Sequence, residues 1–266
     1  MKKRSIIWYL RIYIKIITQD IKVKLNYRAD FVISNFAQIL HHISGFIVFW
    51  LIFQNFPSVD GWDYYEMLFF YGFSLIAFTP TQCLLENNWS LPWQVRSGDF
   101  IKYCFRPINT FFYYISEVFD TKGFGQLVAG IVVLAFAWLR LEIAFSFITL
   151  ALLILMLSAA GIFMAAMLNL AASTIFWTKG FGLMEFVVRF RDYSRYPITI
   201  FSGFLRYLFT FAIPMAFISY YPSLMFLRPD QVPILTWLSP LIGIAFFALS
   251  YFAWMKGAKS YSGTGS

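Results

Sequence analysis

The stretch FSFITLALLILMLSAAGIFMAAMLNLAA, residues 145–172, determines the fold class of this chain. It contains no charged residue, and it is longer than the roughly 20 apolar residues that a helix needs to cross a bilayer. Water is absent from the hydrocarbon core, so a crossing segment must satisfy its own backbone hydrogen bonds, which an α-helix does. The stretch therefore predicts a transmembrane helix.

Five more segments meet the same criterion of length and apolar composition. Hydrophobic residues make up 60% of the 266-residue chain and charged residues only 13%, whereas about a quarter of a typical soluble domain is charged. We predict an all-α integral membrane protein whose single transmembrane domain, 31–255, holds six helices. These helices are expected at 31–53, 64–84, 123–139, 145–172, 198–217 and 235–255.

The distribution of lysine and arginine predicts the orientation of these helices. Residues 1–30, 85–122, 174–197 and 256–266 carry eight, four, four and two Lys or Arg, whereas the loops between them carry only Arg140 and Arg228. Basic residues near span ends favour the cytoplasm, so both termini are predicted to be cytoplasmic, including the tail 256–266. The net charge of +8 follows from this topology, and it does not require a nucleic-acid partner.

The segment 1–30 has the pattern of an amphipathic helix that lies in the membrane interface. Its basic face carries Arg4, Arg11, Lys15 and Lys22 together with Thr18, and its apolar face carries Leu10, Ile14, Ile17 and Ile21. A basic face binds anionic lipid headgroups, and an apolar face enters the acyl boundary. The pattern is compatible with a membrane anchor and also with part of a platform for a soluble partner.

The loop 85–122 mixes charged and aromatic residues and holds no apolar run that could span. Within it, the turn Ser97-Gly98 precedes Asp99, which we expect to cap a short helix that carries Phe100, Ile101 and Phe105. Arg106-Pro107 would end this helix. Such a helix either lies flat on the membrane or inserts its apolar side into a groove of a cytoplasmic protein.

Polar side chains within the predicted spans need an explanation, because they are costly in hydrocarbon. Asn35, Gln38, His42 and Gly45 form a stripe along the first span, and we expect helix packing there in preference to substrate contact. Arg206, near the start of the fifth predicted span, is expected to extend to the cytoplasmic interface, although an internal cavity is the alternative.

Four motifs give the chain its resemblance to a known family. They are YRADF at 27–31, RSGD at 96–99 leading to RPIN at 106–109, IPMAF at 213–217 leading to Tyr221-Pro222, and YSGTGS at 261–266. In this order, between spans of this number and orientation, the chain resembles the permeases of type-2 ATP-binding-cassette (ABC) exporters, in the compact six-span subgroup.

The resemblance implies a set of roles for particular residues. The loop would contain a coupling helix that docks on an ATPase, with the interfacial helix beside it, and 214–234 would form short extracellular helices that re-enter the membrane. Phe217 and Tyr221 would then lie near the pathway, although both also fit an interfacial aromatic belt. The docking residues would be Arg96, Ser97, Gly98, Asp99, Phe100, Lys102, Arg106 and Pro107, and those of the interfacial helix Arg11, Lys15, Lys22 and Arg28.

The resemblance also implies partners and a location. Two cytoplasmic ABC ATPase subunits and a second permease, identical or related, would complete a transporter in the bacterial plasma membrane. This transporter would move a hydrophobic or amphipathic compound outward by alternating access. The 33 Phe, 16 Tyr and nine Trp residues of this chain suit contact with such a compound and also suit contact with lipid.

The chain itself lacks the motifs for nucleotide, metal or hydrolytic chemistry. It has no phosphate-binding G-x-x-x-x-G-K-[ST] loop, so we expect a partner chain to bind ATP and Mg and this chain to bind no cofactor. His41 and His42 are adjacent, and Cys83 and Cys104 are predicted to be free thiols.

Two other classes of function stay open. One is a membrane enzyme that acts on a lipid-linked substrate with Glu86, Asp99 or Glu117, and the other is a channel.

Overall fold

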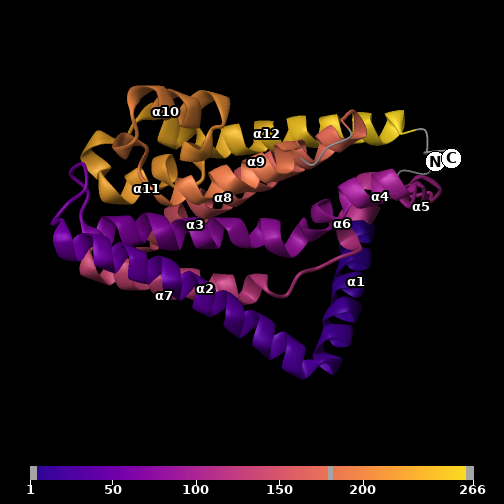
Figure 1. Ribbon diagram of the computed structural model, residues 1–266, viewed down its shortest axis with the longest axis horizontal. Helices are drawn as coiled ribbons and strands as arrows, with labels where there is room; N and C mark the ends of the chain where they lie inside the picture. Colours follow the sequence, from indigo (N-terminus) through magenta and orange to yellow (C-terminus); the bar gives the residue numbers. More distant parts are fainter. Residues whose placement is uncertain (1–4, 179–181, 262–266) are drawn as a thin grey trace.

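The computed structural model describes residues 5–178 and 182–261, and these residues form helices, turns and loops without a β-strand. Figure 1 shows the longest helices running side by side along the long axis of the molecule. The helices are α1 Ile6–Asn26, α2 Arg28–Asn55, α3 Tyr64–Leu84, α4 Leu91–Ser97, α5 Ile101–Cys104, α6 Thr110–Ser116, α7 Gly123–Arg140, α8 Phe147–Ser173, α9 Gly182–Arg191, α10 Gly203–Tyr207, α11 Tyr220–Leu227 and α12 Ile234–Ser260.

Five of the six predicted spans are confirmed as long apolar helices. In the described residues, α2, α3, α7, α8 with its 3-10 extension to Phe176, and α12 are long and apolar enough to cross a membrane. Two of them begin at capping boxes, in which the side chains of Asp63 and Ser146 accept hydrogen bonds from the backbone of Glu66 and Thr149. These caps satisfy amide groups that the first helical turn leaves free, which is why the helices begin there.

The prediction of one transmembrane helix at 198–217 is wrong. The segment is divided into a 3-10 turn at Ile198–Ile200, the short helix α10, a π-helical turn at Leu208–Ala212 and a 3-10 turn at Met215–Phe217. Pro197 and Pro214 cannot donate backbone hydrogen bonds, and Gly203 lowers helix propensity, so the apolar run does not continue as one helix.

The charge pattern assigned 174–197 to a cytoplasmic loop, but the described residues 182–197 instead run along the bundle. Phe176 packs on Trp254 and Phe100 at the end that holds α4 and α5, whereas Thr199 accepts a hydrogen bond of 2.8 Å from Trp62 at the opposite end. Between these points α9 and the 3-10 turn η3, Asp192–Arg195, run beside α8 (Figure 1). Arginines lower the hydropathy of this segment, so it contains no apolar run long enough to predict a span.

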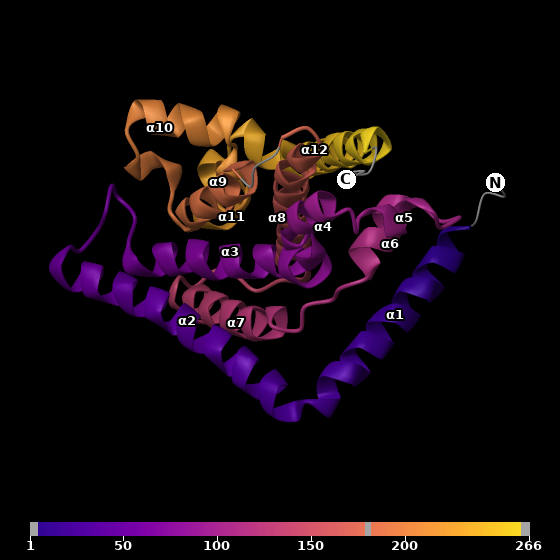
Figure 2. The same cartoon turned by 45° about the vertical axis from the view of Figure 1, so that its right-hand side comes forward.

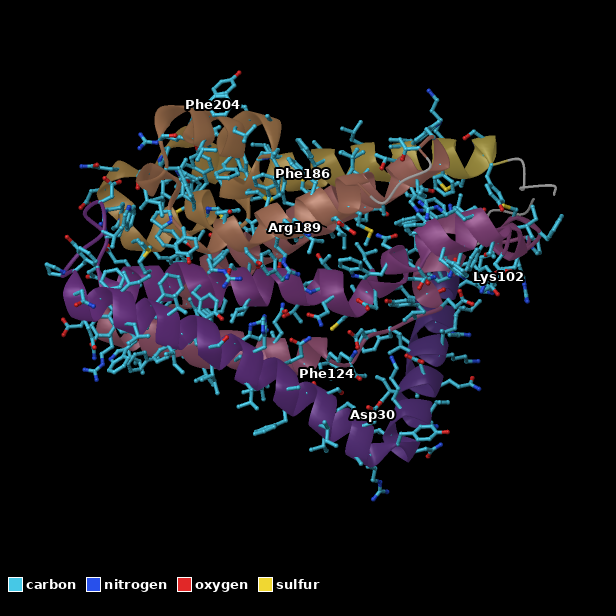
Figure 3. All side chains as sticks on the ribbon, in the orientation of Figure 1. Asp30, Lys102, Phe124, Phe186, Arg189 and Phe204 are labelled. Atoms are coloured by element: carbon cyan, nitrogen blue, oxygen red, sulfur yellow. The ribbon has the colours of Figure 1, made fainter. Side chains whose placement is uncertain are left out.

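The interfacial segment forms a separate helix, α1, that meets α2 at a sharp angle. Figure 2 shows the two helices as the arms of a V, and Asp30 lies near its vertex (Figure 3). The amino-terminal part of α1 packs against α6, where the ring centroid of Tyr9 lies 4.7 Å from that of Phe112. No residue of α1 is fully buried, as expected for a helix at an interface. Residues 1–4, with Arg4, and the end of the tail, 262–266, lie outside the described residues.

Helix α3 forms the centre of the bundle and packs against α7, α8 and α2. Its contact with α7 depends on one glycine from each helix. A Cβ atom added at Gly72 would lie 2.6 Å from the backbone nitrogen of Leu134, and one added at Gly130 would lie 2.9 Å from a side-chain carbon of Ile76. The absence of these two side chains lets the helices approach closely.

We expect Gly72→Ala to destabilise the bundle, because backbone atoms of α7 occupy the position of the new methyl group. The expected loss is about 1–3 kcal/mol, typical of overpacking, and thermal unfolding in a mild detergent measures it. Gly203→Ala is the matched control, since no described atom lies within 4 Å of that Cβ position. Equal unfolding temperatures for the two variants would contradict the close approach of α3 and α7.

Candidate functional site

Residues 91–109, which we call the platform, lie at one end of the bundle beyond the long helices (Figures 1 and 2). Gly98, with φ 85°, joins α4 to α5 in the left-handed conformation that glycine adopts without strain. Trp93 and Phe105 are 68% and 79% exposed, respectively. The other exposed platform side chains are Arg96, Ser97, Asp99, Ile101, Lys102, Cys104, Arg106 and Pro107.

Two sequence expectations for the platform need correction. Asp99 does not cap α5, because the helix begins after Phe100 and the Asp99 carboxylate accepts a hydrogen bond of 2.8 Å from the hydroxyl of Ser97. Phe100 does not belong to a docking surface in this structure, since its side chain is 0% exposed. Its ring packs among Tyr114, Phe176 and Trp254, so apolar burial draws it inward.

Buried aromatic and amide side chains attach the platform to the long helices. Asn87 donates a hydrogen bond of 2.7 Å to the backbone carbonyl of Tyr114. The ring of Tyr103 packs against the ring of Tyr114. Asn88 lies 3.5 Å from Asn169 of α8, which in turn donates to Ser250 of α12 at 3.3 Å. Buried polar groups that bond one another hold a specific arrangement, so the turn η1, Glu86–Trp89, which directly precedes the platform, is fixed to α8 and α12.

The structure also places the charged candidate residues of α1, α2 and the platform. Arg11, Lys15 and Lys22 are exposed along α1, and Arg28 is exposed at the start of α2. Lys102, labelled in Figure 3, forms an ion pair of 2.8 Å with Glu117, whose other oxygen accepts a hydrogen bond from Tyr103. Exposed ion pairs of this kind contribute little stability, so these residues remain available to bind lipid or protein.

A polar cavity of about 310 Å³ lies between the long helices. It differs from the apolar surroundings of the bundle because most of the side chains around it carry amide, hydroxyl or charged groups. The cavity is lined by Gln38, His41 and His42 of α2, Phe78, Thr81 and Gln82 of α3, Glu86 and Trp89 of the 3-10 turn η1, Asp120, Lys122, Gln126 of α7, Met164 and Leu168 of α8, and Val188 and Arg191 of α9.

The residues of the polar stripe in the first span lie in two different environments. The Asn35 side chain accepts a hydrogen bond of 2.9 Å from the backbone of Gly125 in α7, and Gly45 lies against the hydroxyl of Tyr71, so this part of the stripe packs helices. Gln38 and His42 instead line the cavity. Sequence spacing put these residues on one face, but only the positions of α7 and α9 decide which of them packs and which faces open space.

The remaining candidate residues lie away from this cavity. Arg206 donates a hydrogen bond of 2.6 Å to the carbonyl of Thr199 at the end opposite the platform, so the expected cytoplasmic position is wrong. Phe217 and Tyr221 are buried and pack on each other with ring centroids 4.9 Å apart. They belong to the segment 214–234, whose helix α11 packs against α12, α8 and α3.

A second cavity of about 620 Å³ lies on the other side of the contact between α3 and α8. Its lining is apolar apart from a few polar atoms, and Tyr13 of α1 and Phe112 of α6 contribute to it. Pro80 and Gly161 line it where α3 and α8 come close together. The bundle therefore offers one polar and one apolar space near the same level of α3.

Glu86 stands where the polar cavity approaches the platform. Burial raises the pKa of Glu86 to about 7, nearby Asp120 acts in the same direction, and Lys122 and Lys24 act against it. Across the cavity stand His41, His42 and Arg191. Glu86 therefore changes its charge near neutral pH, whereas the carboxyl of an unperturbed Glu would be ionised well below it.

The raised pKa of Glu86 predicts a pH-dependent stability. Between pH 4.5 and about 7 the unfolded chain releases the Glu86 proton while the folded chain retains it, so this residue lowers the free energy of unfolding as the pH rises. Glu86→Gln removes this contribution. We expect its stability relative to the unsubstituted chain to increase by about 3 kcal/mol across that range, as measured by thermal unfolding.

Glu142→Gln is the control for this measurement, because Glu142 is exposed at the opposite end of the bundle. Its stability difference from the unsubstituted chain should stay constant with pH. A constant difference for Glu86→Gln as well would contradict the assignment of a raised pKa to Glu86.

The described residues contain no cluster of three His, Cys, Asp or Glu side chains that would hold a metal ion. Cys83 is buried and Cys104 exposed, and both are free. Trp93 and Arg191 were not among the candidate residues chosen from the sequence. An aromatic residue in a loop without a span, and arginine between two apolar segments, are the signals that point to them.

Residues 39–265 match the family model described as ABC-2 family transporter protein. No curated protein and no solved structure shows significant similarity to the chain.

Proposed function

The chain belongs to the ABC-2 transporter family, as a multi-pass permease of the bacterial plasma membrane that works with ABC ATPase subunits, and on this premise we propose that it is one permease half of an ATP-driven exporter. Two such halves, identical or related, would associate with two ATPase subunits. Each ATPase would bind ATP and Mg, and the permease would move an amphipathic compound outward.

The observation that carries this proposal is the attachment of the platform to the long helices. Trp93 and Phe105 offer exposed apolar contacts of the kind that anchor protein interfaces, and the charges around them favour a specific orientation. Behind this surface, Phe100 and the chain of Asn88, Asn169 and Ser250 reach α8 and α12. Movement of a docked ATPase would therefore shift helices that enclose the cavities.

The energetic argument for transport rests on two states of the permease. Closure of the ATPases on ATP would favour one state, and transport requires that the substrate bind the two states with different affinities. The polar and apolar cavities on either side of α3 suit the two parts of an amphipathic molecule. This supports an amphipathic substrate over a purely hydrophobic one.

An enzymatic role has less support from the geometry. Glu117 is paired with Lys102 and Tyr103, and Asp99 bonds Ser97, so two of the three acids considered for catalysis are held by surface contacts. Glu86 faces the cavity, but the described residues place no nucleophile beside it with a general base.

The docking proposal predicts a loss of ATPase binding when the platform charges are exchanged. Asp99→Arg combined with Arg106→Glu reverses two exposed charges without changing buried contacts. We expect association with the co-expressed ATPase to fall at least about tenfold in a pull-down assay, and Trp93→Ala to have a comparable effect through lost apolar contact. ATP turnover by the complex should fall in parallel.

The matched control makes the same exchange at the opposite end, with Asp230→Arg and Arg140→Glu, where both residues are exposed. This variant should bind the ATPase normally. Normal association of the platform variants would contradict the docking assignment, and a complex that forms without stimulating ATP turnover would contradict coupling.

A further inference from the structure

Arg191, the last residue of α9, places a permanent positive charge beside the polar cavity in the middle of the bundle. Guanidinium groups stay protonated in proteins, and a charge among membrane-spanning helices is costly unless it is paired or faces a polar space. The ring of Phe78, 5.1 Å away, supplies a cation–π contact. That contact offsets only part of the cost of burial.

Arg191, whose side chain is 33% exposed, forms only one long ion pair in the part of the chain that the structure describes. Its nearest carboxylate oxygen is Oδ1 of Asp192, 3.8 Å from Nε, and this oxygen already accepts a hydrogen bond of 2.7 Å from Arg195. Within residues 5–178 and 182–261, the buried Nε of Arg191 has no hydrogen-bond partner. Buried donors are normally satisfied, so this group calls for a partner.

Two more unpaired polar atoms come from other helices. Nε2 of His42 in α2 and the hydroxyl of Thr81 in α3 are buried and likewise have no hydrogen-bond partner among the described residues. Both residues line the cavity together with Arg191. Three helices thus contribute residues with an unsatisfied polar atom to the lining of one space.

The charges around the cavity favour an anion near Arg191. Lys122 lies with the acids Glu86 and Asp120, since both Asp120 and Lys122 act on the pKa of Glu86, whereas Arg191 is affected by neither acid. Glu86 is neutral in part at neutral pH, because its pKa lies at about 7. A volume of about 310 Å³ is at the lower limit of ligand sites, so it suits a headgroup better than a whole amphipathic molecule.

We propose that the polar cavity binds an oxyanion of the phosphate type, with Arg191 as its counter-ion and His42 and Thr81 as hydrogen-bond partners. This inference rests on the proposed transport function in one respect, because it identifies the oxyanion as the headgroup of the transported amphipathic compound. Binding of the anion itself is a property of this chain alone. Its source is either a lipid headgroup or free phosphate.

Isothermal titration of the full chain in a neutral maltoside detergent tests the proposal with three probes. Dihexanoyl phosphatidic acid carries the oxyanion on a short lipid, dihexanoylglycerol is its neutral counterpart, and sodium phosphate is the free anion. We expect phosphatidic acid to bind at least about tenfold more tightly than dihexanoylglycerol, after subtraction of the signal from protein-free micelles. Equal binding of the two lipids would overturn the proposal, and this comparison needs no variant.

The three probes also distinguish the sources of the anion. If sodium phosphate binds as tightly as phosphatidic acid and displaces it, the cavity recognises the free anion. If sodium phosphate binds much more weakly, the lipid part contributes and the ligand is a headgroup. Both results support an oxyanion site, whereas a lack of binding by both phosphate probes overturns it.

Arg191→Gln should lower the affinity for phosphatidic acid at least about tenfold, because it replaces a charged donor with a neutral one. Arg189→Gln is the matched control, since Arg189 lies on the same helix and is exposed (Figure 3), and it should leave the affinity within about twofold. Arg191→Lys retains the charge and should retain part of the affinity. Unchanged binding by Arg191→Gln would overturn the proposal.

The two proposals fail separately. Binding of phosphatidic acid that depends on Arg191, in a chain that never associates with an ATPase, would remove the exporter function and leave the oxyanion site. Normal ATPase association with no preference for the anionic lipid would do the reverse. If Arg191→Gln does not fold, Thr81→Val and the comparison of the two lipids on the unsubstituted chain decide the question.

Discussion

The cost of an unpaired polar group in an apolar environment is the constraint on which this structure depends. It acts first on the backbone, because every amide within hydrocarbon must find a partner, and the long helices from α2 to α12 satisfy that requirement within themselves. It acts next on side chains. Some polar residues within the bundle bond another helix, as Asn35 and Asn169 do, and others line the polar cavity described above.

Residues 182–197, which run along the bundle, are the most highly charged segment to which this constraint applies. Arg191 and Arg195 lie over the rings of Phe78 and Tyr71, and Asp192 pairs with Arg195. These contacts make a charged segment tolerable between apolar helices. They also place the Arg191 charge beside the cavity, where it would meet the proposed oxyanion.

In the proposed exporter, α3, α8 and α12 would connect the platform with the two cavities. Glycines such as Gly72 let α3 and α7 meet closely, so the packed helices move as bodies and do not deform locally. The buried aromatic cluster around Phe100 and Trp254 connects these bodies to the exposed surface of α4 and α5. A protein that docks there acts on helices that line both the polar and the apolar space.

Apolar run length and the absence of charge were sufficient to predict five long helices, because these properties are local and each run is longer than a bilayer requires. The motifs shared with type-2 ABC permeases were likewise readable in the chain, and the family match at 39–265 agrees with them. The Lys and Arg content of 174–197 wrongly predicted a cytoplasmic loop for α9 and η3. A charged segment is acceptable in the bundle only when neighbouring helices supply rings, a counter-ion and a cavity. The break of 198–217 and the inward turn of Phe100 also depended on packing. Which polar residues face open space was therefore decided by the tertiary structure, because burial and pairing arise only when distant segments meet.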